Sequence, residues 1–205
     1  MSLPAGLGAY AAIAAGFVAS GIWYQELPQS TALARPLIAF ALPTAATLTY
    51  LILQSLWHDA TPERAAVTDC FPEVIHRAIA VRVVLFVTAI HVLVLLNLSG
   101  VGWIRIAGPR LVVTLFGGLF IAVGNLLPRT RPNLAVGIRT TRTLSDRRLW
   151  IRLHRTCGYV SVVFGTVVII SGLFLGGPKL GLFVGMTGLA SIAWLAISYR
   201  RQILA

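Results

Sequence analysis

The sequence predicts an all-α membrane protein built as a bundle of six transmembrane helices. Of its 205 residues, 57% are hydrophobic and 11% are charged, whereas soluble domains average about 45–50% apolar and about 25% charged residues. Apolar runs of about 20 residues recur along the chain, and each is long enough to cross the hydrocarbon core of a bilayer. The polar stretches between these runs are too short to form a soluble domain.

The predicted spans follow one another through the whole chain. We expect residues 1–77 to form a two-helix hairpin with a polar connector, and residues 78–205 to form a four-helix domain that carries a basic loop at 128–155. The six spans are predicted at Ala5–Tyr24, Pro36–Trp57, Ala78–Leu98, Leu111–Leu127, Gly158–Leu175 and Leu180–Tyr199.

The charge distribution predicts the orientation of the bundle. The net charge of +11 comes from 17 Lys and Arg residues against six acidic residues. With six spans, 12 of these cations flank the side that holds both termini and the basic loop, four flank the other side, and Arg82 lies within the third span. The positive-inside rule therefore predicts that both termini are cytoplasmic. Since the cations lie in loops beside spans, we expect no direct binding of nucleic acid.

The basic loop, residues 128–155, is the most distinctive segment of the chain. It contains eight Arg, one Asp and no Lys. Pro128, Pro132, Asn133 and Gly137 favour a shaped, irregular path over a helix in its first half. Arg, unlike Lys, can bind a carboxylate or phosphate through two parallel hydrogen bonds. The composition therefore favours a specific binding site over diffuse positive charge.

The second half of the loop predicts an amphipathic helix that lies on the membrane surface before the fifth span. We expect Thr143 to be its N-cap and Asp146 its capping-box partner. At 100° per residue, an apolar arc faces an arginine arc, and such a helix would bind anionic lipid headgroups. A lipid-binding, topology-setting helix thus remains an alternative to a specific site. The apolar arc consists of Leu149, Trp150, Leu153 and Cys157, and the opposite arc of Arg147, Arg148, Arg152 and Arg155.

Few polar groups fall inside the predicted spans, and none is acidic, which argues against a proton-driven transporter. Arg82 lies near a span end, where it can reach the headgroups. His91 lies deep in the third span, and we expect it to be hydrogen-bonded within the bundle. A bis-histidine haem would need a second deep histidine, so we expect neither metal nor cofactor. Cys70 and Cys157 form no metal-ligand pattern, and we expect no disulfide between them.

Glycine patterns predict two further features. The third loop, residues 99–110, contains Gly100, Gly102 and Gly108-Pro109 and is expected to be turn-rich. Two G-x-x-x-G pairs, Gly172/Gly176 and Gly181/Gly185, flank a very short fifth loop. Small residues at this spacing let helices approach closely, so we expect a tight hairpin between the last two spans, or an assembly face for a partner or a second copy.

The order of residues around the basic loop resembles the SdpI family of bacterial integral membrane proteins. The matching positions are Gly124-Asn125, Pro128, Asn133, Gly137-Ile138-Arg139-Thr140, Thr143-Leu144, Trp150, His154-Arg155 and Gly158. The family often has Pro-Trp after Arg-Thr, where this chain has Thr141-Arg142.

The resemblance implies a multi-pass protein of the bacterial plasma membrane that gives immunity to a membrane-active peptide toxin and signals by holding a cytoplasmic repressor through the basic loop. An alternative is a membrane enzyme or carrier that binds a phosphate-bearing lipid or small molecule at the inner interface, with His154 as an acid–base group. A third is an accessory subunit. Because no nucleophile–base pair is visible, a non-catalytic role is favoured. The candidate binding residues are Asn125, Pro128, Arg131, Asn133, Gly137, Arg139, Thr143, Trp150, His154 and Arg155.

Overall fold

The computed structural model describes residues 6–28, 34–58, 71–133, 136–175 and 177–204. Within these ranges, six helices are long and apolar enough to cross a membrane, which confirms the predicted all-α fold class. The long helices are α1 (Leu7–Trp23), α2 (Ala34–His58), α4 (Phe71–Leu98), α5 (Gly102–Gly124), α7 (Arg147–Phe174) and α8 (Gly177–Leu204), and short helices lie at η1 (Tyr24–Glu26), η2 (Leu127–Arg129) and α6 (Thr141–Ser145).

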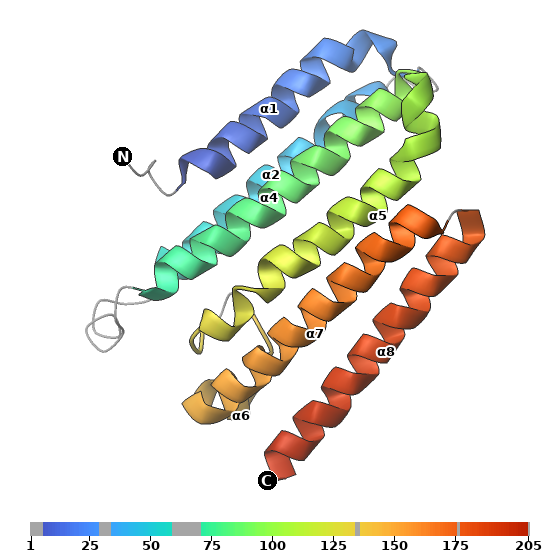
Figure 1. Cartoon of the computed structure of the whole chain (residues 1–205). Helices are drawn as coiled ribbons and strands as arrows, with labels where there is room; N and C mark the ends of the chain where they lie inside the picture. The colour runs from blue at the N-terminus through green and yellow to red at the C-terminus, as the bar shows by residue number, and fades with distance from the viewer. Residues whose placement is uncertain (1–5, 29–33, 59–70, 134–135, 176, 205) are drawn as a thin grey trace.

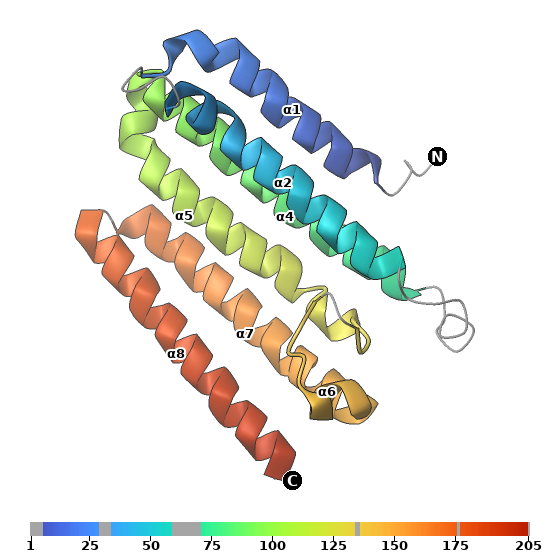
Figure 2. The same ribbon diagram turned by 180° about the vertical axis from the view of Figure 1, so that it is seen from behind.

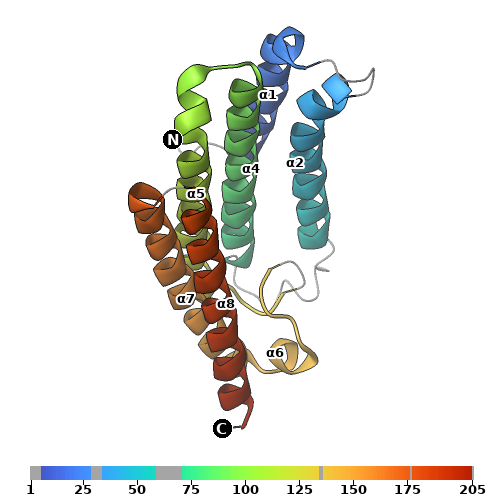
Figure 3. The ribbon, with the colours of Figure 1, turned by 90° about the vertical axis from the view of Figure 1, so that its right-hand side faces the viewer.

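The helices form an elongated bundle in which α4 joins two groups. On one side α4 packs against α1 and α2, and on the other it packs against α5 (Figure 3). Beyond α5, α7 and then α8 continue the row (Figure 1). From behind, α2 lies over α4 (Figure 2). The first turn of α1, the end of α8 and the loop around α6 all lie at one end of the bundle (Figure 1).

A buried polar contact links the three N-terminal helices. Pro43 interrupts the hydrogen bonding of α2 because it has no N–H for the carbonyl one turn earlier, that of Ala39. The Ser20 hydroxyl of α1 lies within hydrogen-bond distance of this carbonyl oxygen and of the Gly16 carbonyl oxygen in its own helix. His91 of α4 is fully buried, with Nε2 2.8 Å from Ser20 Oγ. The prediction that His91 is hydrogen-bonded within the bundle is confirmed.

Glycines bring α5 and α7 into backbone contact. A Cβ added to Gly117 would lie 2.6 Å from Gly165 O, and one added to Gly158 would lie 2.7 Å from Gly124 O. The glycines are spaced seven residues apart on each helix, which keeps them on one face over two turns. Aromatic rings fill the same interface, with the Phe120 and Phe164 centroids 4.8 Å apart.

Of the described glycines in the two predicted G-x-x-x-G pairs, only Gly172 lies at the α5–α7 interface. Gly172 faces α5, where an added Cβ would lie 3.2 Å from Val113 Cγ1. Gly181 and Gly185 are exposed on α8 with nothing within 4 Å of an added Cβ. The last two spans do pack against each other as α7 and α8, but Gly181 and Gly185 do not hold them together in the single chain. Gly176 lies outside the described residues.

Two helix boundaries also differ from the prediction. The third loop is shorter than expected, because α5 already begins at Gly102 and contains Pro109, and its first turns are bent relative to the rest (Figure 1). The amphipathic segment is not a separate surface helix, because α7 runs without a break from Arg147 to Phe174. Its apolar arc packs inward as the first turns of the fifth long helix.

Candidate functional site

The basic loop begins where α5 ends against α7. After Gly124, the short helix η2 contains Pro128 in its first turn. A Cβ added to Gly158 of α7 would lie 2.8 Å from Pro128 Cδ, so the proline ring fits only because position 158 has no side chain. This contact fixes the direction in which the loop leaves the bundle.

Trp150 and His154 form the buried centre of the loop. Their rings are stacked, with centroids 3.9 Å apart and planes 13° from parallel. Trp150 is fully buried, and its Nε1–H donates to the carbonyl of Thr130 at 3.1 Å. Both residues lie on the first turns of α7, so this bond ties the loop to the helix that follows it.

Hydrogen bonds to both ring nitrogens assign the tautomer of His154. The backbone N–H of Ile138 donates to Nε2 at 3.2 Å, so Nε2 is the acceptor. Nδ1 lies 2.9 Å from the Trp150 carbonyl oxygen and must carry the proton. His154 is therefore neutral in this arrangement, 1% exposed, and both of its nitrogens are already bonded.

Gly137 is required by the position of that histidine. Its φ is +117°, a conformation that residues with a side chain rarely adopt. An added Cβ would overlap the His154 ring at Nε2. The Gly137-Ile138 peptide can thus lie against the ring edge and present the Ile138 N–H to it only when residue 137 is glycine.

Thr143 connects the two halves of the loop, although in a different role from the one predicted. The N-cap of α6 is Thr140, and Thr143 is its capping-box partner: Thr143 N–H donates to Thr140 Oγ1 at 3.2 Å, and Thr140 N–H donates to Thr143 Oγ1 at 2.8 Å. The buried Thr143 hydroxyl also donates to Ile138 O at 2.7 Å. The prediction of Thr143 as N-cap is wrong because the segment forms two helices, α6 capped by Thr140 and α7 capped by Asp146.

Two acidic or amide side chains shape the remaining turns. Asp146 is the N-cap of α7 and not the capping-box partner of Thr143, since its Oδ1 accepts from Arg148 N–H at 2.8 Å and Leu149 N–H at 3.1 Å. Asn133 Oδ1 accepts from Val136 N–H at 2.7 Å, and its Nδ2 donates to Arg131 O at 2.6 Å. Both side chains therefore stabilise a change of chain direction through hydrogen bonds to the backbone.

The candidate residues separate into a scaffold of packed or hydrogen-bonded residues and an exposed surface of polar and charged side chains. Arg139, Arg155 and Asn125 are exposed, as are four further arginines of α6 and α7, and Arg131 is half-buried. The further exposed arginines are Arg142, Arg147, Arg148 and Arg152. The scaffold consists of the buried Thr143, Trp150 and His154, the half-buried Pro128 and Asn133, and the exposed Gly137.

Residues outside the predicted set also hold the loop. The Tyr199 hydroxyl of α8 donates to Thr140 Oγ1 at 3.1 Å, and Gln202 Nε2 donates to Thr156 Oγ1 at 3.2 Å. Thr130 supplies the carbonyl for Trp150. Thr130 contributes only a backbone carbonyl, and Tyr199 and Thr140 are 59 positions apart in sequence. Neither contact produces a local sequence pattern. Among the described residues, no group of three or more His, Cys, Asp or Glu is placed to hold a metal ion.

Residues 129–198, which cover the loop, α7 and most of α8, match the SdpI/YfhL protein family. The chain is similar to the immunity protein SdpI of Bacillus subtilis (strain 168), with 24% identity over 200 residues that cover 89% of this chain and 88% of that protein. It is also similar to the uncharacterized protein YfhL of the same organism, with 38% identity over 63 residues, 29% of this chain and 57% of YfhL. No solved structure matches.

The six apolar helices and the ordered loop at one end of the bundle define a multi-pass bacterial membrane protein. Over the loop, α7 and most of α8, the chain is similar to the SdpI/YfhL protein family. The match to the family begins at residue 129, so it includes nearly all of the basic loop and its Trp150–His154 centre.

Proposed function

We propose that this protein gives immunity to a membrane-active peptide toxin and signals by holding a cytoplasmic repressor through the arginines of the basic loop. The relative named as an immunity protein matches over most of both chains. The observation that supports a signalling role is the division of the loop into a bonded scaffold and an exposed arginine surface. A scaffold with this many fixed contacts keeps the backbone positions of the arginines in a defined arrangement, which favours recognition of acidic partner groups.

The alternative of a membrane enzyme or carrier has less support. An acid–base catalyst must offer a free lone pair or a transferable proton to a substrate. His154 has both nitrogens bonded to the backbone and is almost fully buried. The exposed arginines can bind a phosphate group, but this geometry favours a docking surface over a reaction site.

Protection is tested by expressing the chain in a bacterium that is sensitive to membrane-active peptides and measuring survival on challenge. We expect the wild-type chain to raise the lethal concentration of at least one such peptide. If cells with verified membrane expression of the chain are as sensitive as cells without it across the peptides tested, immunity is not its function.

The repressor contact is tested separately. In a variant with Arg142, Arg147, Arg148 and Arg152 all changed to Ala, we expect cytoplasmic partners to be lost from a pull-down, because the guanidinium surface is removed while the scaffold stays. The matched control changes the same four residues to Lys, which keeps the charge but not the bidentate geometry, and should retain binding only in part. Unchanged partner retention in the Ala variant would argue against docking at this surface.

A further inference from the structure

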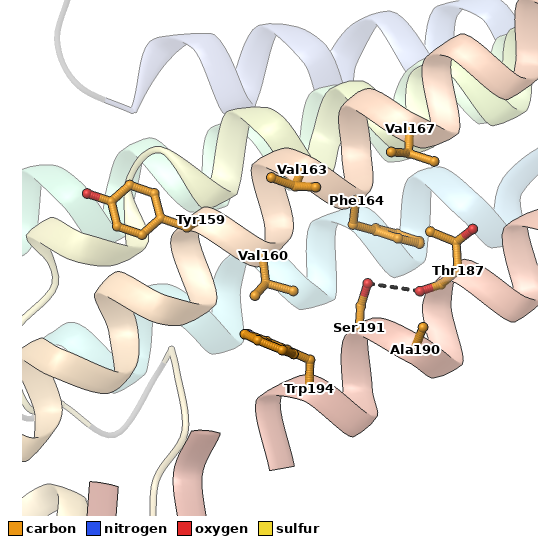
Figure 4. Close-up of a pocket in the computed structure, with 9 residues that line it drawn as sticks. All are labelled: Tyr159, Val160, Val163, Phe164, Val167, Thr187, Ala190, Ser191 and Trp194. Carbon is orange, nitrogen blue, oxygen red and sulfur yellow. Dashed lines mark hydrogen bonds between the residues drawn. The ribbon is translucent and has the colours of Figure 1, made fainter. Parts of the chain in front are cut away.

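A groove lies between α7 and α8, outside the scaffold of the basic loop. It encloses about 380 Å³ and is lined on the α7 side by Tyr159, Val160, Val163 and Phe164. Ala190 and Trp194 are among the lining residues on the α8 side, and Val160 and Phe164 face them across the gap (Figure 4). Tyr159, Val163 and Trp194 are each at least 60% exposed. On helices that cross a membrane, this exposure is to lipid.

The two hydroxyl groups of α8 in the groove are already bonded to their own helix. Ser191 Oγ donates to Thr187 O at 2.9 Å (Figure 4). Thr187 Oγ1 donates to Phe183 O at 2.8 Å. Because these donors are satisfied, the walls suit a hydrocarbon chain, which has no polar groups of its own to offer.

Arginines continue the groove toward the end of the bundle that carries the basic loop. Arg155 and Arg152 precede Tyr159 by four and seven residues, so helical geometry places them on the same face of α7. Arg201 follows Trp194 by seven residues on the antiparallel α8 and shares its face in the same way. The bond between Gln202 and Thr156 shows that these two helix segments lie side by side. All three arginines are exposed.

The groove therefore combines an apolar slot, an aromatic border and a cationic end. Tyr159 and Trp194 lie between the aliphatic walls and the arginines, the position that aromatic residues favour at the boundary between hydrocarbon and headgroups. Each turn of helix advances about 5.4 Å, so Arg155 lies one turn beyond the ring of Tyr159. This order of groups matches the order of acyl chain, glycerol and phosphate along a phospholipid.

We propose that this groove binds one anionic phospholipid, with an acyl chain between α7 and α8 and its phosphate at Arg152, Arg155 and Arg201. Planar guanidinium groups bind phosphate through paired hydrogen bonds. Basic side chains near a membrane surface favour anionic over zwitterionic lipid, about fivefold for each residue. Arg152 and Arg155 also belong to the arginine surface proposed for the repressor. Lipid binding is nevertheless measured without toxin or repressor, so its failure is distinguishable from failure of the immunity proposal.

The test measures which lipid reaches Trp194. The full chain is reconstituted into phosphatidylcholine vesicles that contain a low fraction of either phosphatidylglycerol or phosphatidylcholine with brominated acyl chains, which quench nearby tryptophan fluorescence. A Trp194→Phe variant, measured in parallel, isolates the signal of Trp194 from that of the other tryptophans. We expect brominated phosphatidylglycerol to quench Trp194 at a fraction at least about fivefold lower than brominated phosphatidylcholine.

Variants distinguish the site from ordinary contact with bulk lipid. Arg152→Ala combined with Arg155→Ala should remove the preference for phosphatidylglycerol, whereas Arg147→Ala combined with Arg200→Ala, at the same end but off the groove face, should keep it. Ala190→Phe should fill the slot and lower quenching by both lipids. Ala196→Phe, which is exposed on α8 and does not line the groove, is its control.

Two results would overturn the proposal. Equal quenching by the two brominated lipids would mean that Trp194 meets bulk lipid only. Absence of quenching by either lipid would mean that a protein surface, such as a second copy of the chain, covers the groove.

Discussion

At the scale of single residues, the basic loop depends on one peptide unit that lies against the edge of a histidine ring. Gly137 allows the approach, Ile138 supplies the N–H, and His154 accepts it. The ring is held from its face by Trp150 and from its other nitrogen by the Trp150 carbonyl. Two aromatic side chains one helical turn apart thus organise a segment of chain that has little regular structure.

A substitution at Gly137 tests this arrangement. Gly137→Ala should lower the free energy of unfolding by about 1–3 kcal/mol, because a residue with a side chain is strained at positive φ. Overlap of the new Cβ with the His154 ring should add a penalty of about 1–3 kcal/mol. Unfolding of the purified chain in detergent, followed by tryptophan fluorescence, measures the change.

Gly181→Ala is the matched control for Gly137→Ala. Nothing lies within 4 Å of an added Cβ at Gly181, and Ala is favoured over Gly within a helix by about 0.5–1 kcal/mol. We expect this variant to be as stable as the wild type or slightly more so. Equal stability of the Gly137 and Gly181 variants would show that the peptide does not lie against the ring in solution.

At the scale of elements, the contact between α5 and α7 is set by glycine. Helices inside a membrane gain no hydrophobic free energy by leaving lipid for one another, so close backbone packing is a main source of their association. The four glycines of α5 and α7 provide that packing over two turns. The same contact places Pro128 against Gly158, so it also positions the start of the basic loop.

Two adjacent glycines of α5 allow a direct test. Gly117→Ala should destabilise the α5–α7 pair by about 1–3 kcal/mol, because the new Cβ would lie 2.6 Å from a backbone oxygen that cannot move freely. Gly118→Ala has open space around its Cβ and should be neutral or stabilising. Thermal unfolding of both variants in detergent measures the difference, and similar melting temperatures would contradict the packing.

At the scale of the whole molecule, the six spans of the described residues put the start of α1, the end of α8 and the loop around α6 at one end of the bundle. The arginine count predicts that this end is cytoplasmic. A green fluorescent protein fused after Ala205 should therefore fluoresce, and alkaline phosphatase fused at the same point should be inactive, because it folds only outside the cytoplasm. The reverse pattern would place the basic loop outside the cell.

Composition and hydropathy are enough to predict the fold class and the number of spans, because length and apolarity alone decide whether a helix can cross a bilayer. Periodicity also identifies the buried face of Leu149, Trp150, Leu153 and Cys157, all of which are buried. Boundaries are harder to predict. The amphipathic stretch looked like a surface helix because its charged arc is broad, yet tertiary packing extends α7 through it.

The candidate site was predicted by residue type and order, whereas its internal roles depend on contacts that are remote in sequence. Proline, glycine and asparagine mark the turns of the loop through their local conformational preferences. The bonds from Trp150 to Thr130 and from Tyr199 to Thr140 join positions 20 and 59 residues apart. Such pairs arise from helix packing, so the sequence identifies the participants without identifying their partners.

The unbroken course of α7 has a mechanical consequence. Its 28 residues make a rod about 42 Å long at 1.5 Å per residue. If such a rod pivots by about 10° around the end near Phe174, Arg147 at the opposite tip travels about 7 Å. An event deep in the bilayer that wedges α7 away from its neighbours is thereby amplified into a large displacement of guanidinium groups, with no need for the loop itself to unfold.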